Sequence, residues 1–249
     1  ESSIKQHFYK LDDNNERLLA IRLLLLQHQP ESTVIFCNTK LDVQDVADTL
    51  TERGFSVLSL HGDLEQKDRD QALLQFANKS VSILVATDVA ARGLDIEKLD
   101  AVINYHISRD FEVHIHRIGR TGRAGSKGIA CSLFSSKESH KMAELEEFLG
   151  QSIEGEALPP QRVLKNKIMT PPMVTLNINL GKKQKLRPGN ILGSLTGENG
   201  INGKEVGKIH IFDNSAYVAV THKALKDAQR ILDKTSWKGR SMRGWLIQR

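Results

Sequence analysis

A short stretch of the sequence, HRIGRTGR at residues 116–123, places three arginines and a histidine among two glycines. Arginine is always charged and presents a planar fork of donors that suits phosphate oxygens, while glycine lets the backbone approach a ligand closely. Phosphoryl transfer needs positive charge where negative charge builds up on the transferred group, and Arg120 and Arg123 suit that role. A solvated basic loop would have the same composition.

Further candidate groups follow apolar runs elsewhere in the chain. Backbone amides and a hydroxyl that could grip a sugar-phosphate backbone are offered by Gly62, Thr87 and Gly93. Arg69 would add a charge-assisted phosphate contact. Gln66, three residues earlier, fits a surface helix turn as well as a ligand contact, and His61 fits a hydrogen-bonded histidine beneath a sheet edge better than direct RNA contact.

Short apolar runs alternate with helical periodicity over the first 150 residues. The runs are 33–38, 56–62, 81–88, 100–106 and 128–134. This alternation predicts an α/β fold, a doubly wound parallel sheet with helices on both faces. Ligands bind such sheets beyond the carboxyl ends of the strands. We therefore expect the groups after these runs and the loop before HRIGRTGR to gather at one edge.

Four segments together resemble one protein family. They are VIFCNT at 34–39, HGDLEQKDR at 61–69, ATDVAARGLD at 86–95 and HRIGRTGR. In order and approximate spacing they resemble the motifs of the second RecA-like lobe of DEAD-box RNA helicases, and the resemblance covers residues 1–150. It implies ATP and Mg²⁺ as cofactors, with Arg120 and Arg123 reaching a nucleotide held mainly by another lobe.

The resemblance also implies roles for neighbouring residues. His116 and Arg117 would latch the two lobes together, and Asp95 would accept hydrogen bonds from the ribose hydroxyls. A helix N-cap would explain Asp95 almost as well. The same resemblance makes Gly62, Arg69, Thr87 and Gly93 RNA contacts of this lobe.

Two motifs of the family are not found in the sequence. There is no G-x-x-x-x-G-K-[ST] phosphate loop, since Gly203 and Lys204 are followed by Glu205, and there is no DEAD tetrapeptide. We therefore expect this chain alone to bind ATP weakly at best and not to hydrolyse it. The sequence starts at Glu1 and not at Met, which also favours a fragment, and we expect the C-terminal part of a longer enzyme.

Charge divides the chain into two parts. Residues 159–249 hold 17 Lys and Arg against 5 Asp and Glu, a net charge of +12, whereas residues 1–158 carry −7. A basic module beside an acidic one is typical of nucleic-acid binding, with solubility or anionic lipid as alternatives. Cys37 and Cys131 lie in apolar runs, which favours buried thiols and a reducing, cytoplasmic compartment. The longest apolar stretch is too short to span a bilayer, so we expect no membrane partner.

A second domain is predicted after a linker. Four prolines and a loss of periodicity place the linker at 151–172. Residues 173–249 then show the order βαββαβ, which predicts a smaller α+β domain like an RRM. The first strand lacks the usual aromatic, and Tyr217 in the third fits base stacking and core packing equally well.

Basic residues cluster in the loops of this second domain. They are Lys182, Lys183, Lys185, Arg187, Lys238, Arg240 and Arg243. Together they favour phosphate-dominated, salt-sensitive binding to a folded RNA. The module, with GKKQKLRPGNILGSLTGENGI after its first strand, resembles the one in DbpA-type DEAD-box proteins. That implies recognition of a large-subunit rRNA hairpin and adjoining duplex in ribosomal assembly intermediates.

The sequence thus predicts the C-terminal part of an ATP-dependent RNA helicase that unwinds short duplexes, acting as a monomer. The alternative is a non-catalytic RNA-binding protein or RNA chaperone with a RecA-like fold.

Overall fold

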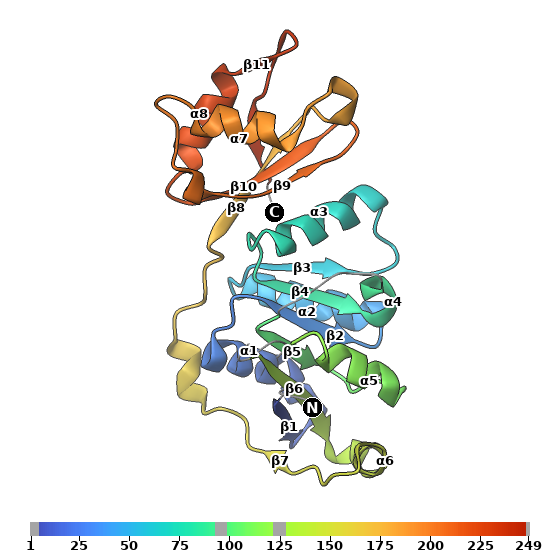
Figure 1. Ribbon diagram of the computed structural model, residues 1–249. Coiled ribbons are helices and arrows are strands. Elements are labelled where there is room, and N and C mark those ends of the chain that lie inside the picture. Colours follow the sequence, from blue (N-terminus) through green and yellow to red (C-terminus); the bar gives the residue numbers. More distant parts are fainter. Residues whose placement is uncertain (1–4, 93–98, 122–127, 248–249) are drawn as a thin grey trace. The chain divides into compact units, whose positions relative to one another are not determined.

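The chain folds into two compact units (Figure 1). The computed structural model describes residues 5–92, 99–121 and 128–247. The first unit comprises residues 1–72 and 82–170, and the second comprises residues 73–81 and 171–249. Each unit has its own apolar core.

The first unit is built on a parallel sheet of seven strands in the order β3-β4-β2-β5-β6-β1-β7. The strands are β1 Lys5–Leu11, β2 Thr33–Cys37, β3 Val57–Leu60, β4 Ile83–Thr87, β5 Ala101–Asn104, β6 Ile129–Ser135 and β7 Gly155–Glu156. The helices are α1 Arg17–His28, α2 Lys40–Glu52, α3 Gln66–Ala77, α4 Asp88–Ala91, α5 Phe111–Ile118 and α6 Ser139–Leu149, and the residues of α3 from 73 on belong to the second unit. This architecture confirms the predicted α/β class.

The central strands are buried on both faces, as their unbroken apolar runs predict. In β2, Ile35 and Cys37 join the core that α1 and α2 cover. The intervening Val34 and Phe36 point to the opposite face and are also buried. On that face, Phe134 of β6 packs with residues of α6. Helices therefore cover both faces of the sheet.

Local sequence signals set where the helices begin. Thr39 caps α2 by accepting a hydrogen bond from the amide of Asp42 at 3.1 Å. Asp110 caps α5 in the same way, through the amide of Glu112 at 3.0 Å. Thr87 caps α4. Because each cap follows a strand or its loop, the helices start close to the carboxyl edge of the sheet.

The two cysteines are free and buried, as expected. Burial raises the pKa of Cys37, and it raises the pKa of Cys131 to about 12. Neither thiol is therefore a ready nucleophile at neutral pH. No helix in the described part of the chain has the length and apolar character needed to cross a membrane.

The segment expected to be a linker packs along the first unit as far as residue 170. β7 pairs with β1, and a 3₁₀ turn at Gln161–Lys165 lies against α1. Val163 in this turn is buried, and Leu158 and Ile168 pack on the same core. Burial of these apolar side chains explains why the segment lies on the first unit.

The second unit is a four-stranded antiparallel sheet in the order β13-β8-β10-β9, with two helices. Its elements are β8 Met173–Ile178, α7 Pro188–Thr196, β9 Val206–Ile211, β10 Ala216–Thr221, α8 Leu225–Lys234, β11 Ser236–Trp237, β12 Arg240–Ser241 and β13 Gly244–Leu246. Leu176, Ile178 and Val218 pack on one face with α7 and α8. The order confirms the predicted RRM-like fold. The hairpin β11–β12 was not predicted from the sequence.

Candidate functional site

Groups from four neighbouring strands meet at the carboxyl edge of the parallel sheet. Strands β3, β4, β2 and β5 lie side by side and run in one direction. Gly62 follows β3, Thr87 ends β4, Asn38 follows β2 and His106 follows β5. The expected gathering at one edge is confirmed, because all four positions end parallel neighbours.

Arg117, in the last turn of α5, holds this edge together. Its side chain is 1% exposed, and its Nε and Nη2 atoms donate to the two carboxylate oxygens of Asp88 at 2.7 and 2.6 Å. Further bonds reach Oδ1 of Asn104 at 3.1 Å, the carbonyl of His106 at 2.9 Å and Oδ1 of Asn38 at 3.0 Å. All five N–H donors of a guanidinium are thereby used. The residue ties together the ends of β2, β4 and β5.

This network gives Arg117 a role inside the unit, and the interlobe contact that the resemblance implied for it stays a prediction. A direct latch to another lobe would require its guanidinium to leave bonds that are already made inside the unit, where it also lies 5.1 Å from the ring centroid of Phe36. Removing a buried charge from its partners is costly. Arg117 is therefore an internal clamp. His116, its neighbour, is exposed, and its contact with a second lobe stays a prediction.

A hollow of about 330 Å³ opens between α4 and α5, and the clamp residues Arg117 and Asp88 form part of its wall. Arg92, His116 and Arg120 line it with donors that suit phosphate oxygens. Asp110 and Glu112 also lie on its wall, so the lining carries both signs of charge. A phosphate group would fit where the two arginines and the histidine face the hollow.

Arg120 is held in place by its backbone. Its amide donates to the carbonyl of Arg117 at 3.3 Å, and its carbonyl accepts from the amide of Leu99 at 3.2 Å. Thr121 continues this link through a short bridge to Leu99. The other residues predicted for nucleotide or RNA binding nearby, Gly93, Asp95 and Arg123, lie outside the described residues.

Fit to the implied cofactors differs between ATP and Mg²⁺. The donors around the hollow match the phosphates of a nucleotide. Within residues 5–92, 99–121 and 128–247, His, Cys, Asp and Glu side chains form no group of three or more that could hold a metal ion. The described residues therefore fit the phosphates of ATP and do not by themselves form a magnesium site.

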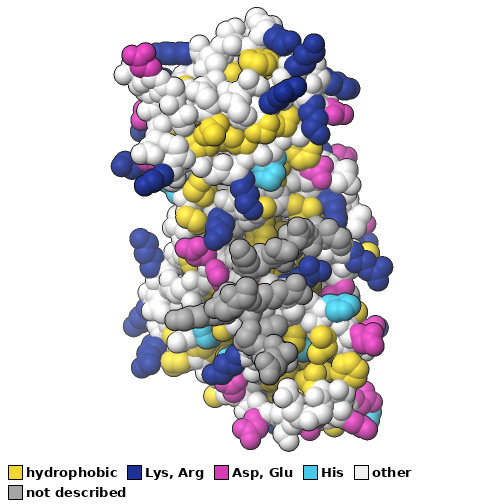
Figure 2. Space-filling view, viewed as in Figure 1, with side chains coloured by type: hydrophobic (Ala, Val, Ile, Leu, Met, Phe, Trp, Pro, Cys, Tyr) yellow, Lys and Arg dark blue, Asp and Glu magenta, His cyan; other side chains and the backbone are white. Residues whose placement is uncertain are grey.

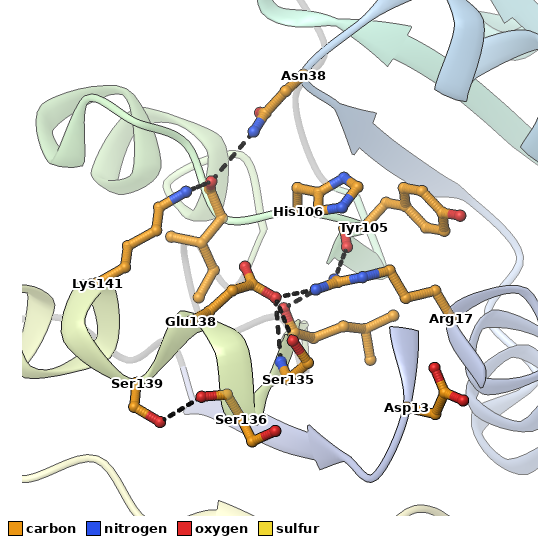
Figure 3. Close-up of polar contacts among 12 residues, drawn as sticks. Asp13, Arg17, Asn38, Tyr105, His106, Ser135, Ser136, Glu138, Ser139 and Lys141 are labelled. Atoms are coloured by element: carbon orange, nitrogen blue, oxygen red, sulfur yellow. Dashed lines mark hydrogen bonds and ion pairs between the residues drawn. The ribbon is translucent and has the colours of Figure 1, made fainter. Parts of the chain in front are cut away.

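A second polar network fixes the loop that leads into α5 (Figure 3). Buried Arg17 of α1 donates to the backbone carbonyls of Tyr105 and Leu133 and pairs with Glu138. Glu138 also accepts from the amide of Ser135 at 3.0 Å. These bonds join α1 to the ends of β5 and β6. Sequence motifs missed Arg17 and Glu138, which lie far apart in the chain.

Figure 3 also shows the contacts of Asn38 and Lys141 beside this network. Asn38 donates to the carbonyl of Ile107 at 3.3 Å, and Lys141 of α6 donates to the same oxygen. Since Asn38 also accepts from Arg117, its amide side chain connects the clamp to the loop between β5 and α5. Burial, followed by the nearby positive charge of Arg17, lowers the pKa of His106. The loop between β5 and α5 is thus held from both sides.

Of the described residues predicted to contact RNA in this lobe, two make hydrogen bonds to α4 and one has open space around it. The hydroxyl of Thr87 accepts from the amide of Ala90 at 3.3 Å, and Arg69 donates to the carbonyl of Ala90 at 2.7 Å. Both side chains therefore brace α4. Gly62 is open, because a Cβ atom there would meet no atom within 4 Å. His61 accepts from the backbone two residues on, as expected for a hydrogen-bonded histidine.

Gln66 behaves as a surface helix turn. Its amide donates to Asp70 at 2.8 Å, one turn further along α3. This contact supports the surface interpretation that the sequence left open for Gln66.

In the second unit, close backbone packing fixes the first group of basic residues. The amides of Lys182 and Lys183 donate to the carbonyls of Phe212 and Asp213 at 2.8 and 2.9 Å. A Cβ atom at Gly181 would lie 2.1 Å from the carbonyl oxygen of Phe212, so only glycine fits there. The loop therefore rests against the turn between β9 and β10.

The second basic group joins the first through two hydrogen bonds. The indole of Trp237 donates to the carbonyl of Gln184 at 2.8 Å, and Arg240 donates to the carbonyl of Asn179 at 3.3 Å. The sequence thus folds its two basic clusters into one region, which we call the basic surface. Its exposed members are Lys182, Lys183, Lys185, Arg187, Lys238 and Arg240. Figure 2 shows several Lys and Arg side chains on the part of the surface that this unit forms.

Tyr217 lies on the sheet face opposite the helices. It stands in register with Asn177 of β8 and His210 of β9, and its ring makes an edge contact with Phe212 at a centroid distance of 5.7 Å. Its side chain is 2% exposed, which together with the ring contact favours core packing, and its RNA contact stays a prediction. Arg243 lies over the ring of Trp245, a residue that sequence reasoning missed.

Fold and site together define a class of protein: a RecA-like helicase lobe followed by an RRM-like module. Family models agree with this division. The helicase conserved C-terminal domain matches residues 15–125, and the DbpA RNA binding domain matches residues 175–244.

Relatives and solved structures give the family. The ATP-dependent RNA helicase DbpA of Escherichia coli (strain K12) is 45% identical over 98% of this chain and 53% of its own length. DbpA of Bacillus subtilis (strain 168) is 32% identical over 88% of this chain and 50% of its own. The E. coli DEAD-box protein SrmB, solved bound to the regulator of ribonuclease activity A, aligns with a TM-score of 0.58 and 31% identity over 67% of this chain and 98% of that one.

The C-terminal domain of the DEAD-box protein Dbp5 aligns with a TM-score of 0.57 and 32% identity over 64% of this chain and 91% of that one. The chain belongs to the DEAD-box helicase family, as a C-terminal part of the DbpA type. It spans about half the length of the curated relatives it matches.

Proposed function

We propose that this chain is the nucleotide-responsive and RNA-tethering part of an ATP-dependent RNA helicase that unwinds short RNA duplexes. The observation that carries the proposal is the hollow lined by Arg92, His116 and Arg120, at the carboxyl edge of a sheet that Arg117 clamps. Two arginine cations with a histidine beside them are suited to the charge that develops during phosphoryl transfer.

The nucleotide would be shared between two lobes. A partner lobe carrying a phosphate loop and a DEAD motif would hold ATP and supply the magnesium ligands, and Mg²⁺ would neutralise phosphate charge there. Arg120 and Arg123 would contact the transferred phosphate from this side, and Asp95 would accept from the ribose. This chain alone would then bind ATP weakly and not hydrolyse it.

RNA would be gripped in the same closed state. Gly62, Arg69, Thr87 and Gly93 would lie along the sugar-phosphate backbone, which they can contact without reading base sequence. Closure of the two lobes around ATP and RNA would favour a bent single strand over a duplex, and hydrolysis would reopen them. Unwinding would therefore be local and limited to short duplexes.

The second unit would keep the helicase on its substrate. Its basic surface favours a structured RNA, and tethering raises the effective concentration of the helicase lobe at an adjoining duplex. We propose a large-subunit rRNA hairpin as this RNA and ribosomal assembly intermediates in the cytoplasm as the setting.

The nucleotide role is tested by Arg120→Ala in the two-lobe enzyme. We expect RNA-stimulated ATP turnover to fall on the order of 10³-fold, as when an arginine finger is removed, while RNA binding by the second unit is unchanged. Arg53→Ala, an exposed arginine on the same unit, is the matched control and should leave turnover unchanged. Normal turnover in Arg120→Ala would favour a non-catalytic RNA-binding protein or RNA chaperone.

The targeting role is tested by direct binding. The whole chain should bind a hairpin of large-subunit rRNA more tightly than an unrelated hairpin of equal length and equal charge. Equal affinities would remove the rRNA proposal and leave a general RNA tether.

A further inference from the structure

One large aromatic side chain of the second unit is exposed beside the basic surface. Trp245 lies on the edge strand β13 and is 45% exposed. The guanidinium carbon of Arg243 lies 3.8 Å from its ring centroid, which is a stacked cation–π contact. An exposed tryptophan ring that is partly covered by an arginine is common where a flat ligand binds.

The register of the sheet places Trp245 on the face opposite α7 and α8. Trp245 pairs with Asn177 of β8, which pairs in turn with Tyr217 of β10. The neighbouring Gly244 points to the helix side, where a Cβ atom would lie 3.0 Å from Leu232. Trp245 is therefore at the edge of this sheet face and not on its two central strands, where Tyr217 is 2% exposed.

The same face leads directly to the basic surface. Asn179 directly follows β8, one residue beyond its end at Ile178. Its carbonyl accepts from Arg240, a member of the basic surface. A nucleotide stacked on Trp245 would thus have the phosphate-binding cations of the basic surface on the neighbouring part of the unit.

Charge decides which occupant suits this ring. Residues 159–249 carry a net charge of +12, and the ring itself is stacked on an arginine. A hollow of about 650 Å³ between α8 and β13 borders it and is also lined by Gln229, Arg230 and Asp233, which offer hydrogen bonds to the edge of a base. Within the described part of the chain, the large apolar side chains that line the hollow are Trp245 and Leu246, too little for an apolar peptide.

We propose that Trp245, together with Arg243, forms a stacking site for one unpaired RNA base at the edge of the second unit. The proposal rests on the RNA-binding role proposed above and adds where a base is held. Base stacking on an aromatic ring is tolerant of sequence, so the site would distinguish unpaired from paired RNA.

Two hairpin RNAs that differ only in a short 3′ tail test the site. One tail carries bases and the other carries abasic sugars, so both have the same number of phosphates. The whole chain should bind the hairpin with bases more tightly, by roughly 5- to 150-fold for one stacked base. Trp245→Ala should abolish this preference and leave binding to the abasic hairpin unchanged, and Trp245→Phe should retain most of it.

Salt dependence separates stacking from phosphate binding. Trp245→Ala should leave the slope of affinity against salt unchanged, whereas Arg240→Ala should reduce it by about one and weaken both RNAs alike. Circular dichroism of Trp245→Phe and Trp245→Ala checks folding. A preference for bases that survives in Trp245→Ala, or is lacking in the unaltered chain, would overturn the stacking site alone. No binding of either RNA by the unaltered chain would overturn the RNA-binding role as well.

Discussion

Replacement of Arg117 by alanine would test whether the carboxyl edge of the sheet depends on one side chain. The change leaves the carboxylate of Asp88 without its partner, and it leaves acceptors of Asn104, His106 and Asn38 without a donor. Removing one partner of a buried ion pair costs about 3–5 kcal/mol. We expect the free energy of unfolding of the first unit to fall by that amount.

Lysine at the same position gives a second, graded test. Lysine keeps the charge but has three donors in place of five, so at least two acceptors lose their hydrogen bond. Each buried acceptor left unpaired costs about 1–3 kcal/mol. Arg117→Lys should therefore lose at least about 2 kcal/mol and lie between the unaltered chain and Arg117→Ala.

Urea unfolding can assign the loss to one unit. Both tryptophans, Trp237 and Trp245, lie in the second unit, so their fluorescence follows that unit, while circular dichroism follows both. With a urea dependence of about 2 kcal/mol per M, Arg117→Ala should lower the midpoint of the first unit by roughly 1.5–2.5 M. The fluorescence midpoint should not move.

Arg53→Ala is the matched control, because this arginine is exposed and its loss should change stability by no more than about 0.5 kcal/mol. If Arg117→Ala unfolds within the same limit, the clamp is not what holds the edge. A parallel shift of both midpoints would likewise contradict an effect confined to the first unit.

Three further predictions concern single positions. Gly181→Ala should destabilise the second unit by about 1–3 kcal/mol, because its Cβ would overlap the carbonyl of Phe212. Gly189→Ala is the control and should not destabilise the unit, because its Cβ would meet no atom within 4 Å. Tryptophan fluorescence in urea compares the two variants. Gly62→Ala should fold normally yet lower RNA-stimulated turnover of the two-lobe enzyme if RNA backbone passes there; equal turnover would exclude that contact. Burial, then two nearby cations, lowers the pKa of His114 to about 4. The unfolded chain, with a pKa near 6.5, therefore takes up the proton first, and the first unit should lose about 3 kcal/mol as pH falls from about 6.5 to 4, a loss that His114→Gln should reduce.

Local patterns predicted most of the first unit because its central strands are short apolar runs between helices. The strand at Lys5–Leu11 was not predicted, and it alternates buried and exposed side chains less clearly. It pairs with residues 129–135, far along the chain, and such long-range pairing leaves no local signal. The 151–172 segment was predicted to be a linker, and its packing on the first unit has no local signal either, since its apolar side chains are sparse and their partners distant.

The sequence predicted which residues belong to the candidate site better than it predicted what each residue does. The spacing of HRIGRTGR identified His116 and Arg120, which the structure places around one hollow. It could not identify Arg117 as internal, because a charge pattern does not show how many donors find partners after folding. Arg17 had no motif at all, and its acceptors come from three separate elements.

The clamp and the hollow are two consequences of one helix. Arg117, in the last turn of α5, turns inward, where its donors are all used. His116 of α5 and Arg120, two residues beyond the end of the helix, both line the hollow. An arginine that must meet developing charge works best when its backbone cannot move, since reorganisation then costs little. Arg117 supplies that rigidity through bonds to three strand ends. Loss of Arg117 should therefore impair the nucleotide response even though Arg120 itself is unchanged.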